Sequence, residues 1–377
     1  MKLRSGRLLT APLPPIRQAV AHVVNLPGVS NLTIGDPAIS VPQSVRLAGA
    51  DAFLSGPHSY TPNLGLIELR RLVVKDLETR LGLTYGDDDI CITNGGNQAI
   101  TLAIAATTQP ADGILMPSPG YPNFTMAAHF AGNTIETYDC SEDTQWLPTL
   151  HTLERAYRDD VSLLILNTPS NPTGAVMNPH QLAEIADWAR FRNLWILSDE
   201  CYWPYSDTGR FSIAQFAPER TYILDSFSKR FGFTGWRIGT LAAPRGEANK
   251  LLKGQEATVA CISYPAQAAA MAAISDRTGH YEREYERFSA QRNQLVETLN
   301  SLGKTPAVGN GGIYAWANFS QVVDTTRNDW HLDLMKTANI AVVPGSAFGE
   351  NAQQWGRLSA AINENDFALA LERVRSI

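Results

Sequence analysis

The middle of the chain alternates short apolar runs with longer amphipathic stretches. Apolar runs of strand length lie at 89–93, 113–117, 133–139, 161–167, 194–200, 221–226 and 237–243. Stretches with the apolar spacing of helices lie between several of them, at 97–108, 147–160 and 178–193. Continuous apolar strands that alternate with helices are typical of a mostly parallel sheet covered on both faces. The pattern therefore predicts an α/β fold.

The pattern changes after about residue 245, where helices come to dominate. Helical spacing is found at 246–261, 264–275, 279–303 and 365–377, and strand-like runs at 311–319 and 339–346. This arrangement predicts a second, smaller α+β domain, and the first thirty residues are expected to pack with it.

Polar, glycine-rich or aromatic residues follow five of the predicted strands. These segments are NGGNQA (94–99), SPGYPNF (118–124), TPSNPTG (168–174), the run from Asp199 to Tyr202, and SFSK (226–229). Ligands of open α/β sheets bind beyond the carboxyl ends of the strands. The sequence therefore predicts a binding site at this edge of the sheet.

Composition and charge exclude several classes of protein. A hydrophobic content of 44% and a charged content of 18% are ordinary for a soluble globular protein, and the net charge of −6 gives no basic surface for nucleic acid. No apolar run approaches the roughly 18 residues of a membrane span, and residues 1–20 lack the apolar core of a signal peptide. The four cysteines are scattered and the histidines show no ligand spacing, so we expect reduced thiols, no metal site and a cytoplasmic location.

The segment 94–97 and three later residues could hold an anion. Glycines let the backbone approach an anion closely, and a helix that begins there offers free N–H groups. Ser226, Ser228 and Arg237 could add hydroxyl and guanidinium donors to the same anion. The spacing matches neither a P-loop nor a dinucleotide fingerprint, and an ordinary tight turn remains the alternative.

The other polar residues at the strand ends suit an aromatic ligand. Asp199, at the end of an apolar strand, could pair with a cationic ring nitrogen or simply cap the next element. Tyr121 could stack on a flat ring or pack in the core, and Asn171 could hold a phenolic oxygen or form a turn. Lys229 could capture an aldehyde. Phosphate, basic aromatic ring, phenolic oxygen and aldehyde together describe pyridoxal phosphate.

On these residues the sequence resembles the class I and II aminotransferases, which are fold-type I enzymes dependent on pyridoxal phosphate. The similar segments run in order through most of the chain: 35–37 (GDP), 59–70, 93–99, 169–174 (PSNPTG), 198–202 (SDECY), 226–239 (SFSKRFGFTGWRIG), 344–349 and 356–361. The resemblance implies a large domain at 36–275 with a mostly parallel, seven-stranded sheet. It implies a smaller α+β domain made of residues 1–35 and 276–377.

The resemblance also implies roles for single residues. Lys229 forms the internal aldimine, Asp199 pairs with the pyridine nitrogen, and these two with Tyr202 form the catalytic set. The other residues implied in cofactor binding are Gly96, Asn97, Tyr121, Asn171, Ser226, Ser228 and Arg237. Gly35, Asn171 and Arg357 contact the substrate, with Arg357 gripping its α-carboxylate. Tyr60 reaches the phosphate of a partner subunit, which implies a homodimer with shared active sites.

The activity implied is transfer of an amino group from an L-amino acid to a 2-oxo acid with ping-pong kinetics. The same residues would also serve a carbon–sulfur β-lyase or a biosynthetic cyclase, oxidase or decarboxylase, because pyridoxal phosphate supports all of these reactions. A regulatory domain fused to a DNA-binding module is a weaker alternative, since no basic helix-turn-helix segment is spare. Trp203, Trp236 and Phe231 are expected in the core, with a place in the substrate pocket as the alternative.

Overall fold

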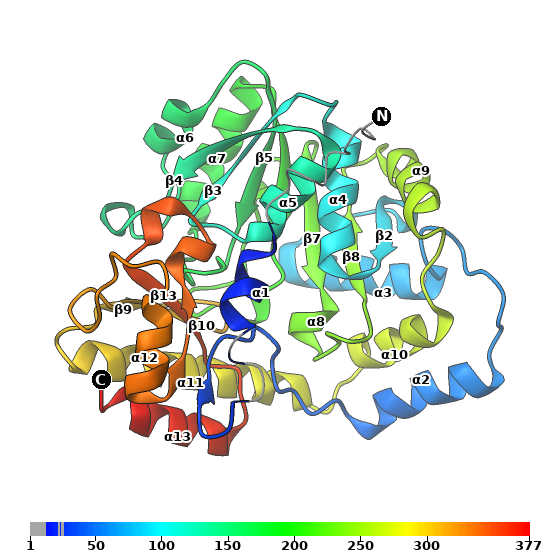
Figure 1. Cartoon of the computed structure of the whole chain (residues 1–377). Helices are drawn as coiled ribbons and strands as arrows, with labels where there is room; N and C mark the ends of the chain where they lie inside the picture. The colour runs from blue at the N-terminus through cyan, green and yellow to red at the C-terminus, as the bar shows by residue number, and fades with distance from the viewer. Residues whose placement is uncertain (1–12, 22, 24–25) are drawn as a thin grey trace, which may run out of the picture.

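A seven-stranded sheet forms the centre of the computed structural model, which describes residues 13–21, 23 and 26–377 (Figure 1). Its strands are β2 (Ile90–Thr93), β3 (Gly113–Ser118), β4 (Thr134–Asp139), β5 (Val161–Asn167), β6 (Trp195–Asp199), β7 (Thr221–Ser226) and β8 (Gly239–Ala242). They lie in the order β2-β8-β7-β6-β5-β3-β4, and among these strands β8 alone runs antiparallel to its neighbours. The predicted α/β fold with a mostly parallel, seven-stranded sheet is confirmed.

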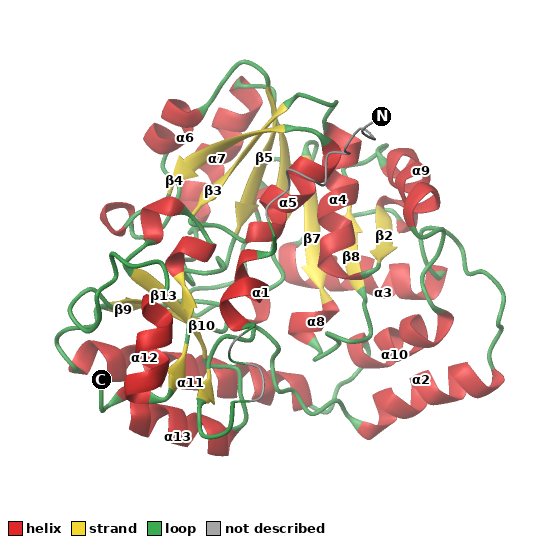
Figure 2. Ribbon diagram, in the orientation of Figure 1, coloured by secondary structure: helices red, strands yellow, loops and turns green. Residues whose placement is uncertain are grey.

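Helices cover both faces of this sheet (Figure 2). The helices of this part are α3 (Ile67–Leu81), α4 (Gly95–Thr107), α5 (Pro122–Ala131), α6 (Leu150–Ala156), α7 (Pro179–Phe191), α8 (Phe227–Arg230), α9 (Ala248–Thr258) and α10 (Tyr264–Ile274). Helix α2 (Gln43–Ser55) packs against α10 and lies apart from the sheet. Along β5, Leu163 and Ile165 join one apolar cluster, whereas Leu164 and Leu166 join another with α7. Because side chains alternate along a strand, burial on both faces explains why the strands are apolar throughout.

A smaller, antiparallel sheet lies beside the central one, in the order β12-β13-β10-β9. Its strands are β9 (Ala307–Val308), β10 (Tyr314–Asn318), β12 (Val343–Pro344) and β13 (Trp355–Ser359). The helices of this part are α11 (His280–Ser301), α12 (Trp330–Ala338) and α13 (Glu364–Val374). An apolar cluster that includes Leu299, Trp330 and Leu371 fills the space between them.

The N-terminal segment contacts the C-terminal part of the chain. Strand β1 (Ser30–Asn31) pairs in parallel with β11 (Ile340–Ala341), and helix α1 (Pro15–Val20) contacts β12. The expected domain boundaries at 35/36 and 275/276 stay a prediction, and residues 1–12 of the smaller domain lie outside the described residues. In the described ranges, no helix is both long and apolar enough to cross a lipid bilayer.

Candidate functional site

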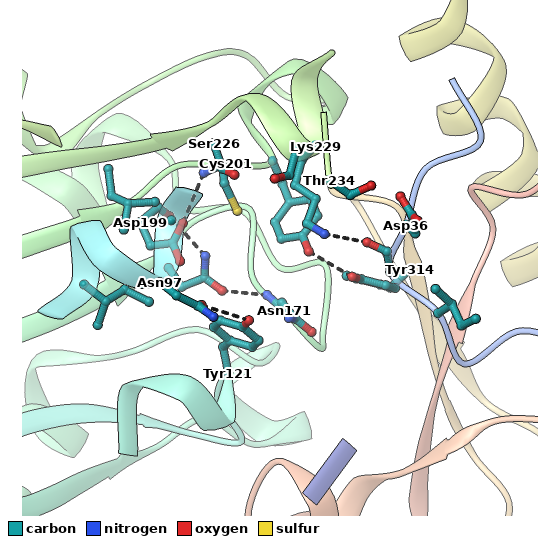
Figure 3. Close-up of a pocket in the computed structure, with 18 of the residues that line it drawn as sticks. Asp36, Asn97, Tyr121, Asn171, Asp199, Cys201, Ser226, Lys229, Thr234 and Tyr314 are labelled. Atoms are coloured by element: carbon teal, nitrogen blue, oxygen red, sulfur yellow. Dashed lines mark hydrogen bonds between the residues drawn. The ribbon is translucent and has the colours of Figure 1, made fainter. Parts of the chain in front are cut away.

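A cavity of about 320 Å³ opens at the carboxyl ends of the central strands. Figure 3 shows its side chains pointing inward from the strand ends and from the smaller part of the chain. It is lined by the sequence-predicted residues Gly35, Gly96, Asn97, Tyr121, Asn171, Asp199, Tyr202, Ser226, Ser228, Lys229, Arg237 and Arg357. The structure thus gathers into one cavity groups that the sequence spreads over 323 positions, from 35 to 357.

Lys229 stands in the single turn of α8, which begins where β7 ends. Its Nζ donates a hydrogen bond to the carbonyl oxygen of Gly35, and the Tyr205 hydroxyl donates to the carbonyl oxygen of Lys229 at 2.6 Å. No carboxylate of the described residues forms an ion pair with Lys229, unlike its neighbour Arg230, which pairs with Asp76. The amine is therefore held inside the cavity by a neutral acceptor and remains available to a ligand.

Asp199 ends β6 and is buried at the bottom of the cavity. The Cys201 N–H donates to Asp199 Oδ1 at 3.2 Å, and no cation of the described chain pairs with this carboxylate. Burial raises the pKa of Asp199 to about 6, the Cys201 hydrogen bonds oppose that shift, and the nearby carboxylates of Asp225 and Glu200 add to it. A cationic hydrogen-bond donor from a ligand would relieve this burial cost.

The start of α4 and Arg237 lie together at the cavity, where the glycines of the segment lead us to expect an anion. Gly95 has φ +72°, and a Cβ there would lie 2.4 Å from Arg237 Nη2. Arg237 itself has φ +58°, and its guanidinium donates to the Thr234 and Asn94 carbonyl oxygens at 2.9 and 3.4 Å. It makes no ion pair with a described carboxylate. A free guanidinium beside a helix N-terminus, with Ser226 on the same wall, suits a phosphate group.

Tyr121 and two asparagines form the opposite wall. The Tyr121 hydroxyl lies 3.4 Å from Asn97 Oδ1, which also accepts from Asn123 Nδ2 at 2.9 Å. The Asn171 N–H donates to Asn167 Oδ1 at 2.7 Å, so the turn after β5 is fixed by its own strand. These bonds hold an aromatic ring and an amide at the cavity surface (Figure 3).

Arg357 enters the cavity from β13 and is buried, with 3% of its surface exposed. Its Nη1 donates to Asn171 Oδ1 at 2.9 Å and its Nη2 to the Thr33 carbonyl oxygen at 2.7 Å. Its Nε has no partner among the described residues, and no described carboxylate pairs with the guanidinium. A buried guanidinium that is held only by neutral acceptors can still bind the carboxylate of a ligand.

The lining also includes residues to which the sequence assigned no role: Ile34, Asp36, Ile100, Asn167, Cys201, Leu224, Thr234 and Tyr314. The Tyr314 hydroxyl lies 2.8 Å from the Tyr202 hydroxyl, and the Arg357 guanidinium lies 4.2 Å from the centre of the Tyr314 ring. A Cβ on Gly35 would come within 2.0 Å of the Tyr314 hydroxyl, so only glycine fits there. Tyr314 therefore connects the N-terminal segment, Tyr202 and Arg357.

Tyr60 is not among the residues that line the cavity. It lies in the segment between α2 and α3, and 90% of its surface is exposed. Trp203 and Phe231 are buried away from the cavity, in agreement with the core placement expected for them. Trp236 is half-buried and stacks on Phe233, with 4.9 Å between ring centres.

Comparison with known proteins identifies relatives along the whole chain. Residues 27–374 match the family described as aminotransferase class I and II. The chain is 32% identical to the aromatic-amino-acid aminotransferase 2 of Thermococcus litoralis, over 99% of this chain and 97% of that protein. It is 30% identical to an aspartate aminotransferase of Pyrococcus abyssi, over 96% and 95% of the two chains. The solved structure of the Thermus thermophilus aspartate aminotransferase with maleate superposes with a TM-score of 0.92 at 27% identity, and all of both chains is covered.

Proposed function

This chain belongs to the class I and II aminotransferases, and on that premise we propose that it works with pyridoxal phosphate bound covalently to Lys229. The protein is an aminotransferase whose substrates are amino acids and 2-oxo acids. The observation that carries the proposal is the buried Asp199 carboxylate, which has no described cation and lies in the same cavity as the unpaired Lys229 amine.

The residues present fit this cofactor. The α4 N-terminus, Arg237, Ser226 and Ser228 would hold its phosphate, and Asp199 would hold the proton on its ring nitrogen. Gly96 and Asn97, in the first turn of α4, would also bind the phosphate, and Tyr121 would stack on the ring. Asn171 and Tyr202 would hydrogen-bond the phenolic oxygen, and Tyr314 keeps the Tyr202 hydroxyl in place at 2.8 Å.

Pyridoxal phosphate, when bound, supplies an electron sink for a negative charge that develops at the substrate Cα. The chain's own residues do the rest. Arg357 would bind the α-carboxylate of the amino acid through its unpartnered Nε and so orient the Cα–H bond. Lys229 Nζ, held by the Gly35 carbonyl oxygen, would then accept the Cα proton as general base and, as general acid, deliver it to the cofactor carbon that carries the amino group. Gly35 and Ile34 lie at the cavity wall, where they would help to exclude water.

We further propose a homodimer with shared sites and a cytoplasmic location. Tyr60 is exposed, as expected for a residue that completes a partner's phosphate site. Leu47, Phe53 and Leu54 expose apolar surface on the nearby helix α2, which supports a contact with a second copy. Free cysteines at 91, 140, 201 and 261 support a reducing compartment.

The experiment that tests the function is a half-reaction screen. The purified protein loaded with pyridoxal phosphate is mixed with single L-amino acids, and the visible absorbance band of the lysine-bound cofactor is followed. We expect an amino donor to bleach the band and a 2-oxo acid to restore it. Double-reciprocal plots of the steady-state rate should show the parallel lines of a ping-pong reaction. Release of pyruvate and ammonia without any 2-oxo acid acceptor would instead make the protein a lyase.

A further inference from the structure

A second cavity, which we call the rear cavity, lies on the other side of the segments that carry the catalytic residues. Its volume is about 660 Å³, and its charged and aromatic lining includes Lys75, Arg80, Trp203, Arg210, Arg230 and Arg277. Trp203 and Arg230 directly follow Tyr202 and Lys229, which line the first cavity. Neighbouring residues of one segment therefore line two different cavities.

Three guanidinium groups surround the buried Trp203 ring in the rear cavity. The Cζ atoms of Arg80, Arg210 and Arg230 lie 4.8, 4.8 and 4.6 Å from the ring centre. Burial and the charges of Arg230 and Arg80 lower the pKa of Arg210. Such crowding of like charges is unfavourable unless anions lie close by.

Carboxylates satisfy two of these arginines and leave the third unpaired. Arg230 forms a two-pronged pair with Asp76, at 2.8 and 2.5 Å, and Arg80 Nη1 pairs with the buried Glu200 at 2.7 Å. Arg230 also lies 3.7 Å from the buried Asp225 carboxylate. Arg210 has an exposed side chain and no carboxylate partner among the described residues, so it is a cation of this cavity that is free to bind an anion.

Two of the arginines that line the rear cavity have buried donors without partners. Arg80 Nε, Arg80 Nη2 and Arg230 Nε have no hydrogen-bond partner among the described residues, although the Arg80 side chain is only 4% exposed. Guanidinium nitrogens donate and never accept, so only acceptor oxygens can satisfy them. Two free donors on one side of Arg80 match the two oxygens of a carboxylate or phosphate.

The remaining lining has both apolar and charged parts. Leu72, Phe231, Ala273 and Ile274 form an apolar wall. Lys75 and Arg277 are further cations, and the carboxylates of Asp276 and Glu282 lie at the same cavity. The Asp276 carboxylate is partly satisfied within the chain, since Thr278 Oγ1 donates to Asp276 Oδ2 at 2.8 Å. The cavity therefore combines oxyanion donors with room for an organic group.

We propose that the rear cavity binds a small organic anion, whose carboxylate or phosphate oxygens accept hydrogen bonds from Arg80 and Arg210 and whose apolar part packs on Leu72 and Ile274. This site is separate from the cofactor's phosphate cradle, which is formed by other residues, and it does not depend on the proposed reaction. Since its lining includes the residues that follow Tyr202 and Lys229, an anion bound there contacts the same segments that hold the catalytic side chains.

The test is a calorimetric titration of the protein loaded with pyridoxal phosphate, so that the cofactor's own phosphate cradle is filled. Inorganic phosphate is the phosphate probe. Benzoate is the carboxylate probe. It is titrated into a protein that also carries Arg357→Gln, so that the measured heat of binding does not come from the site proposed for the substrate's carboxylate. Arg210→Gln is the test variant, because this exposed side chain can change without breaking an ion pair. Arg46→Gln on α2, an exposed arginine outside both cavities, is the matched control.

We expect the dissociation constant of at least one probe to rise about tenfold or more in Arg210→Gln and to stay unchanged in Arg46→Gln, a tenfold change being about 1.4 kcal/mol. The probe that responds identifies the oxyanion as phosphate or carboxylate. The proposal is wrong if neither probe binds with a dissociation constant below about 10 mM, which corresponds to a binding free energy of about −3 kcal/mol. It is also wrong if both probes bind Arg210→Gln as tightly as the parent protein. Circular dichroism of each variant checks that the fold is retained.

Discussion

The Asp199 carboxylate is buried and has no cationic partner among the described residues. Its only hydrogen bonds within the described chain come from Cys201, and both Asp225 and Glu200 lie close enough to disfavour its charge. The neighbouring strands β5 and β7 hold it in place through the register of the parallel sheet. A position of this kind is unfavourable in the protein alone and favourable once a cationic ring nitrogen is bound.

The first prediction concerns the pH dependence that Asp199 imposes on the cofactor-free protein. Its pKa of about 6 in the folded chain lies above the value near 3.9 of an unfolded aspartate. Between these two pH values the folded state binds the extra proton, so stability falls as pH rises and is lowest above pH 6. The Asp199→Asn variant has no carboxyl group to ionise at this position, so it lacks this cost, which is worth about 3 kcal/mol at most.

Urea unfolding of the cofactor-free parent and the Asp199→Asn variant from pH 4 to pH 8 measures this effect. We expect the variant to be more stable at pH 8 and the two proteins to converge towards pH 4. Addition of pyridoxal phosphate should reverse the order at pH 8, because only the carboxylate gains a cationic partner. A stability difference that does not change with pH would show that Asp199 is not the buried, unpaired group described here.

Single residues also mark the limit of the sequence reasoning. Asp199 and Lys229 could be identified because their side-chain chemistry is unusual at or just after the end of an apolar strand. Arg237 precedes β8 and was identified by its place in the same segment as Lys229. Tyr314 could not, since one tyrosine in an apolar strand of the smaller part is ordinary core composition. Its place in the cavity depends on how β10 packs against the turn after β5, and that contact between distant segments leaves no local pattern in the sequence.

At the scale of elements, the start of α4 depends on a glycine. Gly95 adopts φ +72°, and the Arg237 guanidinium lies where a Cβ would be, 2.4 Å from Nη2 and 2.8 Å from Cζ. A side chain there would cost about 1–2 kcal/mol in backbone strain and would push the guanidinium out of the cradle. The close approach of helix and arginine is therefore possible only with glycine.

The second prediction follows for Gly95→Ala. We expect its dissociation constant for pyridoxal phosphate to rise about tenfold or more, because Arg237 loses its position. A tenfold rise corresponds to a loss of about 1.4 kcal/mol of binding free energy. Gly82→Ala is the control: this residue, which ends α3, has a similar φ of +69°, and a Cβ there meets nothing within 4 Å. Absorbance titration with the cofactor measures both variants. A Gly95→Ala variant that binds the cofactor as tightly as Gly82→Ala and the parent protein would show that Arg237 does not need a glycine at position 95.

The elements themselves were predicted where the apolar period was strong. All the central strands and the helices near 97–108, 178–193 and 279–303 are present. Helices α2, α3, α5 and α12 were not predicted. Along α2 and α3 the charged and apolar residues do not form a clear stripe, whereas α12 has an apolar face and was overlooked. The predicted strand at 339–346 is divided between β11 and β12, which pair with β1 and β13 in two different sheets. Hydrophobic runs show that a segment is buried, but they do not show which partner it pairs with.

At the scale of the whole molecule, the exposed Tyr60 is the residue whose expected role needs a second copy of the chain. It is 90% exposed here and does not line its own cavity, whereas every other residue expected at the site does so. In a symmetric dimer the same patch is used by both subunits, so each copy would give Tyr60 to its partner. The shared site then makes a clear prediction about mixed dimers.

That third prediction uses two impaired variants, Tyr60→Ala and Lys229→Ala, which are co-expressed so that subunits assort freely. Half of the dimers should be hybrids, and each hybrid has one site with Lys229 of one chain and Tyr60 of the other. About a quarter of all active sites in the mixture should therefore contain both native residues. We expect the activity at limiting cofactor to recover to about a quarter of the parent's activity. If Tyr60 served its own chain, the mixture would show only the average of the two variants.

The central claim is that Lys229, alone among the seven lysines of the sequence, carries the cofactor. The most direct measurement is reduction of the cofactor-loaded protein with borohydride, followed by proteolysis and peptide mass spectrometry. The account predicts one peptide with the added mass of a phosphopyridoxyl group, and fragmentation that places the group on Lys229. The Lys229→Ala variant should yield no such peptide. Stable labelling of another lysine in the parent protein, or an equal yield of labelled peptide from Lys229→Ala, would contradict it.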